Sequence, residues 1–259
     1  MSRLHLTFPC RKHLLAGTLD TAPATTGLLI VSGGNELRSG AFGGQAAMAE
    51  RIARAGFPVF RYDRRGIGDS EGENRGFERS ESDIRAAVEA FKAMTPSVVR
   101  VIAFGNCDAA SALMLAGGAG CDGLILSNPW TIEDDSDDSP PAAAVRARYA
   151  QKLKDPKEIR RLLTGGVNIV KLFRGLKKAS TTEAPVPTGL AERMAAGIAD
   201  FEGQIRFVLA LSDRTAQVFD SVWPADDQRV QRCESASHAW VEPEARAWLE
   251  KQILEALRA

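Results

Sequence analysis

Short apolar segments rich in β-branched residues alternate with helical stretches along most of this chain, and the alternation restricts the folds it can adopt. Strands are indicated at Gly27–Gly34, Phe57–Asp63, Val98–Phe104, Asp122–Trp130, Ile205–Asp213 and Asp227–Glu234. Helices are indicated at Gly43–Gly56, Ser80–Met94, Asp108–Gly118 and Pro243–Ala259. This α/β pattern predicts a mostly parallel sheet with helices on both faces.

The pattern breaks at Thr131–Gln204, where no strand-like segment occurs and the sequence turns from acidic to helical and basic. We therefore predict a core built from residues 1–130 and 205–259, with a helical cap inserted at 131–204. The 259 residues are enough for one large domain that carries such an insertion.

Two charged segments of the predicted cap have alternative interpretations. Val167–Ala179 is a basic amphipathic helix that can contact membrane lipid or an anionic substrate, although packing on its own domain is the more common role. The acidic segment Glu133–Ser139 lacks the glycine and the distal glutamate of an EF-hand loop. We therefore interpret it as a solvated linker rather than a calcium site.

Charge and composition exclude several classes of protein. The chain has 33 Lys and Arg against 33 Asp and Glu, so no basic field indicates a nucleic-acid partner. No apolar segment approaches the roughly 20 residues of a membrane span, and the N-terminus lacks a secretory signal, so we expect a cytoplasmic protein. Four separate cysteines without a C-x-x-C pair indicate reduced thiols, with no metal or cofactor.

The helix Ser80–Met94 opens with a possible capping box. Ser80 and Asp83 have the spacing at which two side chains cap the backbone N–H groups of a helix, although Asp is a weaker partner than Glu there. The spacing therefore predicts the start of this helix.

The segment Gly105–Ser111, "GNCDAAS", follows a strand and precedes a helix. This context is typical of a nucleophile elbow, where small residues stand two before and two after the nucleophile because the backbones crowd together. Gly105 and Ala109 occupy those positions around Cys107, whose thiol would be activated by the helix N-terminus and opposed by the Asp108 charge. The alternative is an inert core thiol, which is the usual role of a free cysteine.

The order of the polar residues favours the nucleophile. A nucleophile, an acid after a late strand and a histidine after the last strand follow one another in α/β-hydrolases. Asp213 and His238 stand at those places, whereas His5 and His13 lie in the first strands. Three other acids fit the order less well, namely Asp220, Asp226 and Asp227. Cys107, Asp213 and His238 are therefore the predicted catalytic triad.

Stabilisation of an oxyanion also needs backbone donors. The N–H of Asp108, directly after the nucleophile, is one candidate, and Gly34 and Asn35 in the loop "SGGNELRSG" are the others. A plain glycine turn is the alternative for that loop. Tyr62–Gly72, "YDRRGIGDSEG", follows a central strand, and we expect it to support the neighbouring loops without a catalytic part.

With these residues placed, the chain resembles the α/β-hydrolase fold over nearly its whole length. "GNCDAAS", "SGGNELRSG", "YDRRGIGDSEG" and "LSDRTAQVF" resemble more narrowly the exosortase A system-associated hydrolases, the first of their two types. That resemblance implies a bacterial cytoplasmic enzyme linked to exopolysaccharide production and PEP-CTERM protein sorting, and it implies no substrate. Dienelactone hydrolases, which also carry an elbow cysteine, are a weaker match.

A cysteine nucleophile restricts the expected reaction. Its acyl-enzyme is a thioester, and expelling an amine needs more help than expelling an alcohol or a thiol, so we expect a small-molecule ester or thioester substrate. Hydrolysis is the first expectation, acyl transfer to another acceptor is the second, and a non-catalytic binding protein on the same scaffold is the third. The predicted cap would select the substrate and exclude water, and the oligomeric state is left open.

Overall fold

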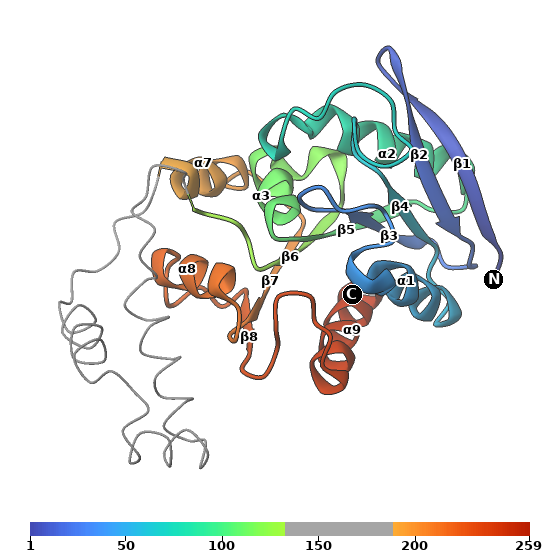
Figure 1. Cartoon of the computed structure of the whole chain (residues 1–259). Helices are drawn as coiled ribbons and strands as arrows, with labels where there is room; N and C mark the ends of the chain where they lie inside the picture. The colour runs from blue at the N-terminus through green and yellow to red at the C-terminus, as the bar shows by residue number, and fades with distance from the viewer. Residues whose placement is uncertain (133–188) are drawn as a thin grey trace, which may run out of the picture.

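An eight-stranded sheet forms the centre of the molecule (Figure 1), seen in a computed structural model that describes residues 1–132 and 189–259. The strands are β1 Arg3–Cys10, β2 His13–Asp20, β3 Thr26–Val31, β4 Val59–Tyr62, β5 Arg100–Asn106, β6 Gly123–Ser127, β7 Gln204–Ala210 and β8 Val230–Cys233. Their order across the sheet is β1-β2-β4-β3-β5-β6-β7-β8. All neighbours from β4 to β8 are parallel, and the β1–β2 and β2–β4 pairs are antiparallel, which confirms the predicted mostly parallel sheet.

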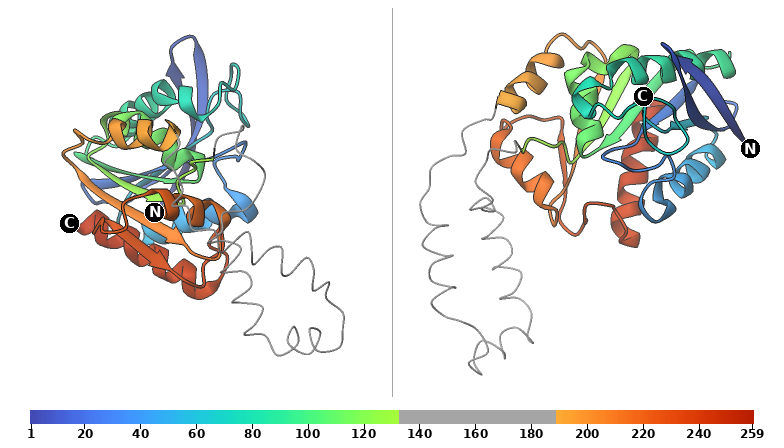
Figure 2. Two further views of the ribbon diagram at one scale, coloured as in Figure 1. Left: turned by 90° about the vertical axis from the view of Figure 1, so that its left-hand side faces the viewer. Right: turned by 45° about the horizontal axis from the view of Figure 1, so that its top comes forward.

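Helices cover both faces of this sheet (Figure 2). The helices are α1 Gly44–Arg54, α2 Glu81–Met94, α3 Asp108–Leu115, α7 Gly189–Gly197, α8 Arg214–Val222 and α9 Pro243–Arg258, with short 3-10 turns η1 Ala41–Gly43, η2 Phe77–Arg79 and η3 Gly117–Gly120. α2, α3, α7 and α8 share one hydrophobic core with the sheet, and α1 and α9 share the other.

Successive side chains of a central strand point to opposite faces of the sheet and therefore belong to different hydrophobic cores. In β3, Leu29 and Val31 join the core under α2 and α3, whereas Leu28 and Ile30 join the core under α1 and α9. All four side chains are fully buried. A strand covered on both faces needs apolar residues at every position, so β3 is a continuous apolar segment without polar alternation.

Aromatic packing fixes α8 against β7. The rings of Phe219 and Trp223 stack with centroids 4.9 Å apart, and Phe207 of β7 lies 5.3 and 5.0 Å from them. Stacked rings of this kind stabilise a contact beyond the apolar area they bury. The N-terminus of α8, which Asp213 caps, is thereby held at the carboxyl edge of the sheet.

The predicted capping box at α2 is wrong. The hydroxyl of Ser80 donates to the carbonyl of Phe77 (2.6 Å) and makes no cap, although the helix does begin at Glu81. Asp83 instead accepts hydrogen bonds from the backbone N–H of Arg65 (3.0 Å) and from its guanidinium (2.6 Å). A buried guanidinium needs a charged acceptor, and this need takes the Asp83 carboxylate away from the helix end.

The helix α7 falls inside the stretch assigned by sequence to the cap, but it packs on the core. Leu190, Met194 and Ile198 are buried in the same cluster as α2 and α3. Residues 133–188 of the predicted cap, which include the acidic segment Glu133–Ser139 and the predicted basic helix Val167–Ala179, lie outside the described residues. Within the described residues no helix is both long and apolar enough to cross a membrane.

The buried Arg65–Asp83 pair should dominate the stability of the loop that follows β4. Arg65 is only 7% exposed, and Asp83→Ala removes the carboxylate that pairs with its guanidinium. Because this leaves a buried charge without a partner, we expect a loss of about 3–5 kcal/mol in the free energy of unfolding, measured in urea. Glu81→Gln is the matched control, because its pair with Arg85 is exposed and should cost about 1 kcal/mol or less. Equal losses for the two variants would contradict this assignment.

Candidate active site

Cys107 stands alone in the turn between β5 and α3. Its backbone has φ 61° and ψ −128°, a strained conformation for a residue with a side chain. The N–H of Cys107 donates to the carbonyl of Ser127 (2.9 Å), and its own carbonyl accepts from Ala110 (3.1 Å). A Cβ at Gly105 would lie 2.8 Å from the backbone of Ala109, so the turn needs a small residue there. The strand, the tight turn and the helix that the sequence predicts around Cys107 are all present.

The three residues of the predicted triad lie together at the carboxyl edge of the sheet. Asp213 follows β7, and its carboxylate accepts hydrogen bonds from the N–H of Ala216 (3.1 Å) and from Nδ1 of His238 (2.9 Å). His238 lies in the loop between β8 and α9, close enough to Cys107 for the thiol to raise the pKa of the imidazole. Because Asp213 takes Nδ1, the imidazole has Nε2 left for the thiol.

Two of the rival acids are engaged elsewhere. Asp220 pairs with Arg232 at 2.6 Å, and Asp227 pairs with Arg229 at 2.7 Å. The Arg229 hydrogen bond is the main cause that lowers the pKa of Asp227 to about 2. Asp213 is therefore the acid that orients the histidine.

The environment of His238 favours its charged form. The hydrogen bond to Asp213, and after it the neighbouring Cys107 thiol, raise the pKa of His238 to about 10, against the opposing effect of burial. At neutral pH the imidazole therefore carries a proton. A positive charge stands beside the thiol of Cys107, and a negative charge stands behind it at Asp213.

The predicted oxyanion donors lie next to Cys107, but one of them is already bonded. The N–H of Gly34 donates to the carboxylate of Asp108 at 2.5 Å, and Arg64 lies 3.3 Å from the other oxygen of that carboxylate. Arg64 also donates to the carbonyl of Gly34. The side chain of Asn35 accepts from Asn74 (2.9 Å), which holds the same loop from its outer side. Sequence reasoning placed Asp108 here for its backbone N–H and for a charge that opposes activation of the thiol, and it missed the contacts of this side chain with Gly34 and Arg64.

Close approach between this loop and the elbow depends on a second glycine. A Cβ at Gly33 would lie 2.6 Å from the Asp108 carboxylate and 2.7 Å from the carbonyl of Asn106. Any side chain at this position would separate the loop from Cys107.

The loop Tyr62–Gly72 supports its neighbours, as the sequence predicts. Buried Asp63 accepts from the N–H groups of Arg38 (2.6 Å) and Asp69 (3.2 Å), and the hydroxyl of Ser70 donates to its carbonyl (2.7 Å). Arg64 extends from this loop to the Gly34 carbonyl described above. No side chain of the loop touches the triad in these contacts.

A buried amide network joins the loops that carry the triad, and sequence reasoning missed it. Asn106 donates to the carbonyl of His238 (3.2 Å) and accepts from Ser127 (2.8 Å) and Asn128 (3.0 Å). Asn128 accepts in turn from the N–H of Ala210 (2.8 Å), three residues before Asp213. The signal that could have found the network is the pair of polar residues at the adjoining ends of β5 and β6.

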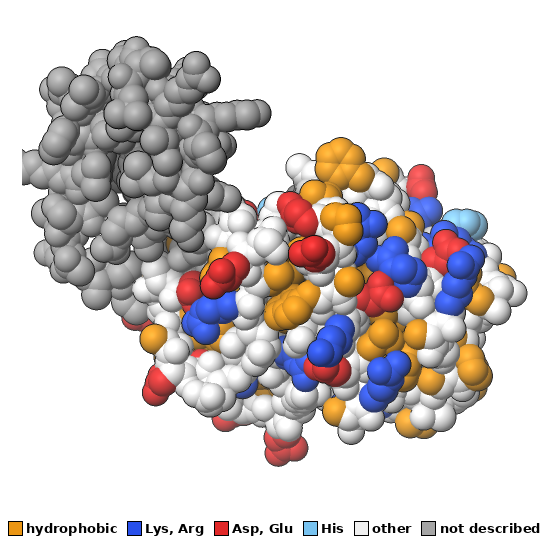
Figure 3. Space-filling view, turned by 90° about the horizontal axis from the view of Figure 1, so that it is seen from below, with side chains coloured by type: hydrophobic (Ala, Val, Ile, Leu, Met, Phe, Trp, Pro, Cys, Tyr) orange, Lys and Arg blue, Asp and Glu red, His pale blue; other side chains and the backbone are white. Residues whose placement is uncertain are grey.

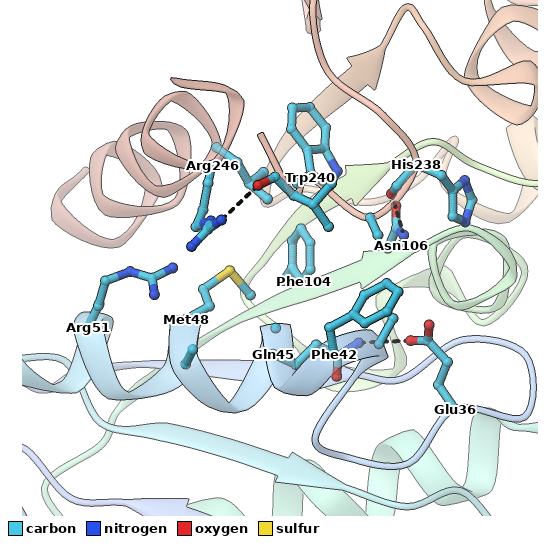
Figure 4. Close-up of a pocket in the computed structure, with 16 residues that line it drawn as sticks. Glu36, Phe42, Gln45, Met48, Arg51, Phe104, Asn106, His238, Trp240 and Arg246 are labelled. Atoms are coloured by element: carbon cyan, nitrogen blue, oxygen red, sulfur yellow. Dashed lines mark hydrogen bonds between the residues drawn. The ribbon is translucent and has the colours of Figure 1, made fainter. Parts of the chain in front are cut away.

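A cavity of about 190 Å³ opens beside these loops, between α1 and α9 (Figure 4). Glu36 and His238 lie at one end of it, and Arg51 and Arg246 lie at the other. Burial raises the pKa of Glu36, while the positive charge of His238 opposes the shift. The parts of the chain that the structure describes contain no cluster of side chains able to hold a metal ion.

Solved structures with the same fold are numerous. An esterase of Pyrococcus furiosus, Pf2001, is 13% identical with a TM-score of 0.61, covering 99% of this chain and 90% of its own. The α/β hydrolase GrgF from Penicillium sp. sh18 is 17% identical with a TM-score of 0.62, covering 100% and 98%. A proline iminopeptidase of Mycobacterium smegmatis is 15% identical with a TM-score of 0.57, covering 98% and 99%. At such identities the likeness concerns the fold.

Sequence comparison gives one assignment. No curated protein sequence matches the chain. A family profile described as "Serine aminopeptidase, S33" matches residues 23–178, which is more than half of the 259 residues. The fold and this match together place the chain among the α/β-hydrolases, as a member of the serine aminopeptidase S33 family.

Proposed function

We propose that the chain is a cysteine-dependent hydrolase that cleaves an ester or a thioester through an acyl-enzyme on Cys107. The observation that carries the proposal is the strained turn at Cys107 beside a histidine that Asp213 holds at 2.9 Å and whose pKa the thiol raises. A cysteine in this position with a charged imidazole beside it is the arrangement that activates a thiol as a nucleophile.

The proposed reaction has two halves. The Cys107 thiolate attacks the carbonyl carbon, and the collapse of the tetrahedral intermediate expels the alkoxide or thiolate, which takes the proton of His238. His238 then removes a proton from water, which attacks the thioester and releases the acid and the thiolate. Asp213 keeps the imidazole oriented and stabilises its charged form throughout.

Developing negative charge on the carbonyl oxygen would be met by the backbone N–H of Asp108, with the N–H of Gly34 or Asn35 as the second donor. Gly34 becomes available when the Asp108 carboxylate gives up its hydrogen bond. Arg64, already 3.3 Å from that carboxylate, would keep the displaced charge paired.

The reaction class follows from the nucleophile. The matching family is described as serine aminopeptidases, but this chain has cysteine at the elbow. A thiolate is a better leaving group than an amine, so a tetrahedral adduct on an amide would tend to revert, and esters or thioesters suit the site better. Esterase Pf2001, with the same fold, is consistent with this choice.

Acyl transfer and non-catalytic binding are the two alternatives to hydrolysis. The same triad supports acyl transfer if an alcohol or an amine replaces water, and a non-catalytic binding protein is the remaining alternative. The association with exosortase and exopolysaccharide systems, and with it a cytoplasmic location, rests on the motifs around Cys107 and Asp213.

Thiol labelling tests the proposal directly. We expect iodoacetamide to alkylate Cys107 faster than Cys10, Cys121 and Cys233 in the same chain, because only Cys107 faces a charged imidazole. His238→Ala should slow the labelling of Cys107 by about tenfold or more, as read by mass spectrometry of each site against pH. Labelling of Cys107 at the rate of Cys233, indifferent to His238, would favour the binding protein.

Turnover needs its own assay. Wild type should hydrolyse 4-nitrophenyl esters and acyl thioesters, and Cys107→Ala should lose this activity. If Cys107 reacts with iodoacetamide but no ester or thioester is hydrolysed, and a bound acyl group instead passes to an added alcohol or amine, the acyltransferase is correct.

The titration of His238 should depend on Asp213. Asp213→Asn removes the main cause of the raised pKa, so the pKa of His238 should fall from about 10 toward 6.5, observed by NMR of the imidazole protons. His5 and His13 supply reference signals in the same spectrum. An unchanged His238 titration would remove Asp213 from the triad.

The same shift has a consequence for stability. Because the folded-state pKa of His238 exceeds its ordinary value of 6.5, the pair stabilises the fold fully below that pH. This contribution is lost as the pH rises toward about 10. The stability difference between wild type and His238→Gln should therefore shrink over this range, in urea unfolding at several pH values.

The amide network should affect the rate rather than substrate binding. Asn128→Ala leaves Asn106 and the N–H of Ala210 short of a partner, which loosens the His238 loop, and we expect kcat to fall about 10- to 100-fold with KM little changed. Labelling of Cys107 by iodoacetamide should slow as well. The exposed Gln228→Ala is the control, and a fall in KM alone would contradict a positioning role.

A further inference from the structure

The cavity between α1 and α9 has a chemical polarity that the proposed reaction does not explain. One end of the cavity lies at the predicted triad: Asn106 precedes Cys107, Glu36 follows the candidate oxyanion donor Asn35, and His238 is a member of the triad. The opposite end is formed by Arg51 of α1 and Arg246 of α9 (Figure 4). One end of the cavity thus carries a carboxylate beside the imidazole of the predicted triad, and the other end carries two guanidinium groups.

The walls between the two ends are apolar. Met48, Phe104 and Leu249 line the cavity with side chains that are at most 7% exposed. Trp240 lies above them and is fixed by a hydrogen bond from its indole N–H to Ser127 (3.0 Å). A wall of this kind binds a hydrocarbon chain and offers it no polar partner along the way.

The rim carries one exposed aromatic ring. Phe42 is 94% exposed and its backbone has φ 53°, a region that residues with side chains rarely adopt. Val241, across the cavity, is 46% exposed. Hydrophobic side chains also lie among mixed charges on the face seen from below (Figure 3). Strain that holds an apolar ring in solvent at the mouth of an apolar cavity is consistent with a ligand that covers the ring.

The basic end has an excess of positive charge. Nε of Arg51 pairs with Glu250 at 2.6 Å, so its charge is balanced. Arg246 donates to the carbonyl of Val241 (2.7 Å), and among residues 1–132 and 189–259 no carboxylate lies within ion-pair distance of it. Figure 4 shows the two guanidinium groups turned toward one another across the cavity. The two guanidinium groups carry two positive charges, and one carboxylate, that of Glu250, balances only one of them. The remaining positive charge attracts an anion.

From this polarity we infer that the cavity is a subsite for an apolar chain that ends in an anionic group, with Arg246 and Arg51 binding the anion. The inference rests on the proposed function, since the other end of the chain would carry the ester or thioester attacked by Cys107. Arg246 attracts the anion to the end of the cavity that lies away from the triad. The substrate class is then a half-ester or half-thioester of a dicarboxylic acid, or an ester whose leaving group bears the anion.

Paired esters test the subsite. 4-Nitrophenyl hydrogen adipate and 4-nitrophenyl hexanoate have acyl chains of equal length and differ in the terminal carboxylate. Wild type should bind the adipate ester with a KM about tenfold lower, and Arg246→Gln should abolish the difference between the two esters. Arg54→Gln, an exposed arginine of α1 paired with Glu50, is the matched control and should keep the preference.

A third ester separates the two sources of the anion. The hexanoate ester of 4-hydroxybenzoate carries the carboxylate on the leaving group. A preference for this ester that Arg246→Gln removes would place the leaving group in the cavity and retain the anionic subsite. Wild type that hydrolyses all three esters with equal KM would overturn the subsite and leave the proposed hydrolase intact.

A binding measurement on a variant without the Cys107 thiol tests the subsite even if the protein hydrolyses no ester. Calorimetry of Cys107→Ala with adipate monoethyl ester, compared with ethyl hexanoate, reports the subsite alone, and Trp240 fluorescence gives a second readout. Tighter binding of the adipate ester, weakened by a further Arg246→Gln change, supports the subsite even if no ester is hydrolysed. Equal binding of the two compounds overturns it.

Discussion

One partly buried side chain, the amide of Asn106, holds the candidate site together. It lies at the end of β5, directly before Cys107, and bonds the end of β6 on one side and the carbonyl of His238 on the other. Through Asn128 the same network reaches Ala210 at the end of β7. The strand ends next to Cys107, Asp213 and His238 are therefore connected by amide groups that have few alternative hydrogen-bonding arrangements.

The strained turn at Cys107 depends on the same sheet. β5 pairs with β3 and with β6 along most of its length, so its end cannot relax toward either neighbour. Gly33 and Gly105 have no side chains, so the surrounding backbones can approach one another closely. A turn of this kind is costly in isolation, and here the cost is offset by central strands that are fully buried on both faces.

The sequence predicted the features that repeat or that keep a fixed order. Apolar segments alternating with helices predicted the parallel sheet, and the order of Cys107, Asp213 and His238 predicted three residues that lie together. Sequence reasoning did not assemble the amide network because its residues belong to different strand ends, although Asn106 and Asn128 each stand at the end of an apolar strand. The prediction of a capping box failed for a related reason. The carboxylate of Asp83 binds Arg65, a residue distant in sequence that only folding brings near.

The bond between Gly34 and the Asp108 carboxylate has a consequence for selectivity. A neutral carbonyl oxygen is a weaker acceptor than a carboxylate, so it cannot take this N–H from Asp108 when a substrate first binds. An oxygen that gains negative charge as the carbonyl is attacked can compete for it. In the proposed reaction the protein's own carboxylate would thus reserve the Gly34 N–H for the charged species on the reaction path, and an inert carbonyl compound of the same shape would gain nothing from it.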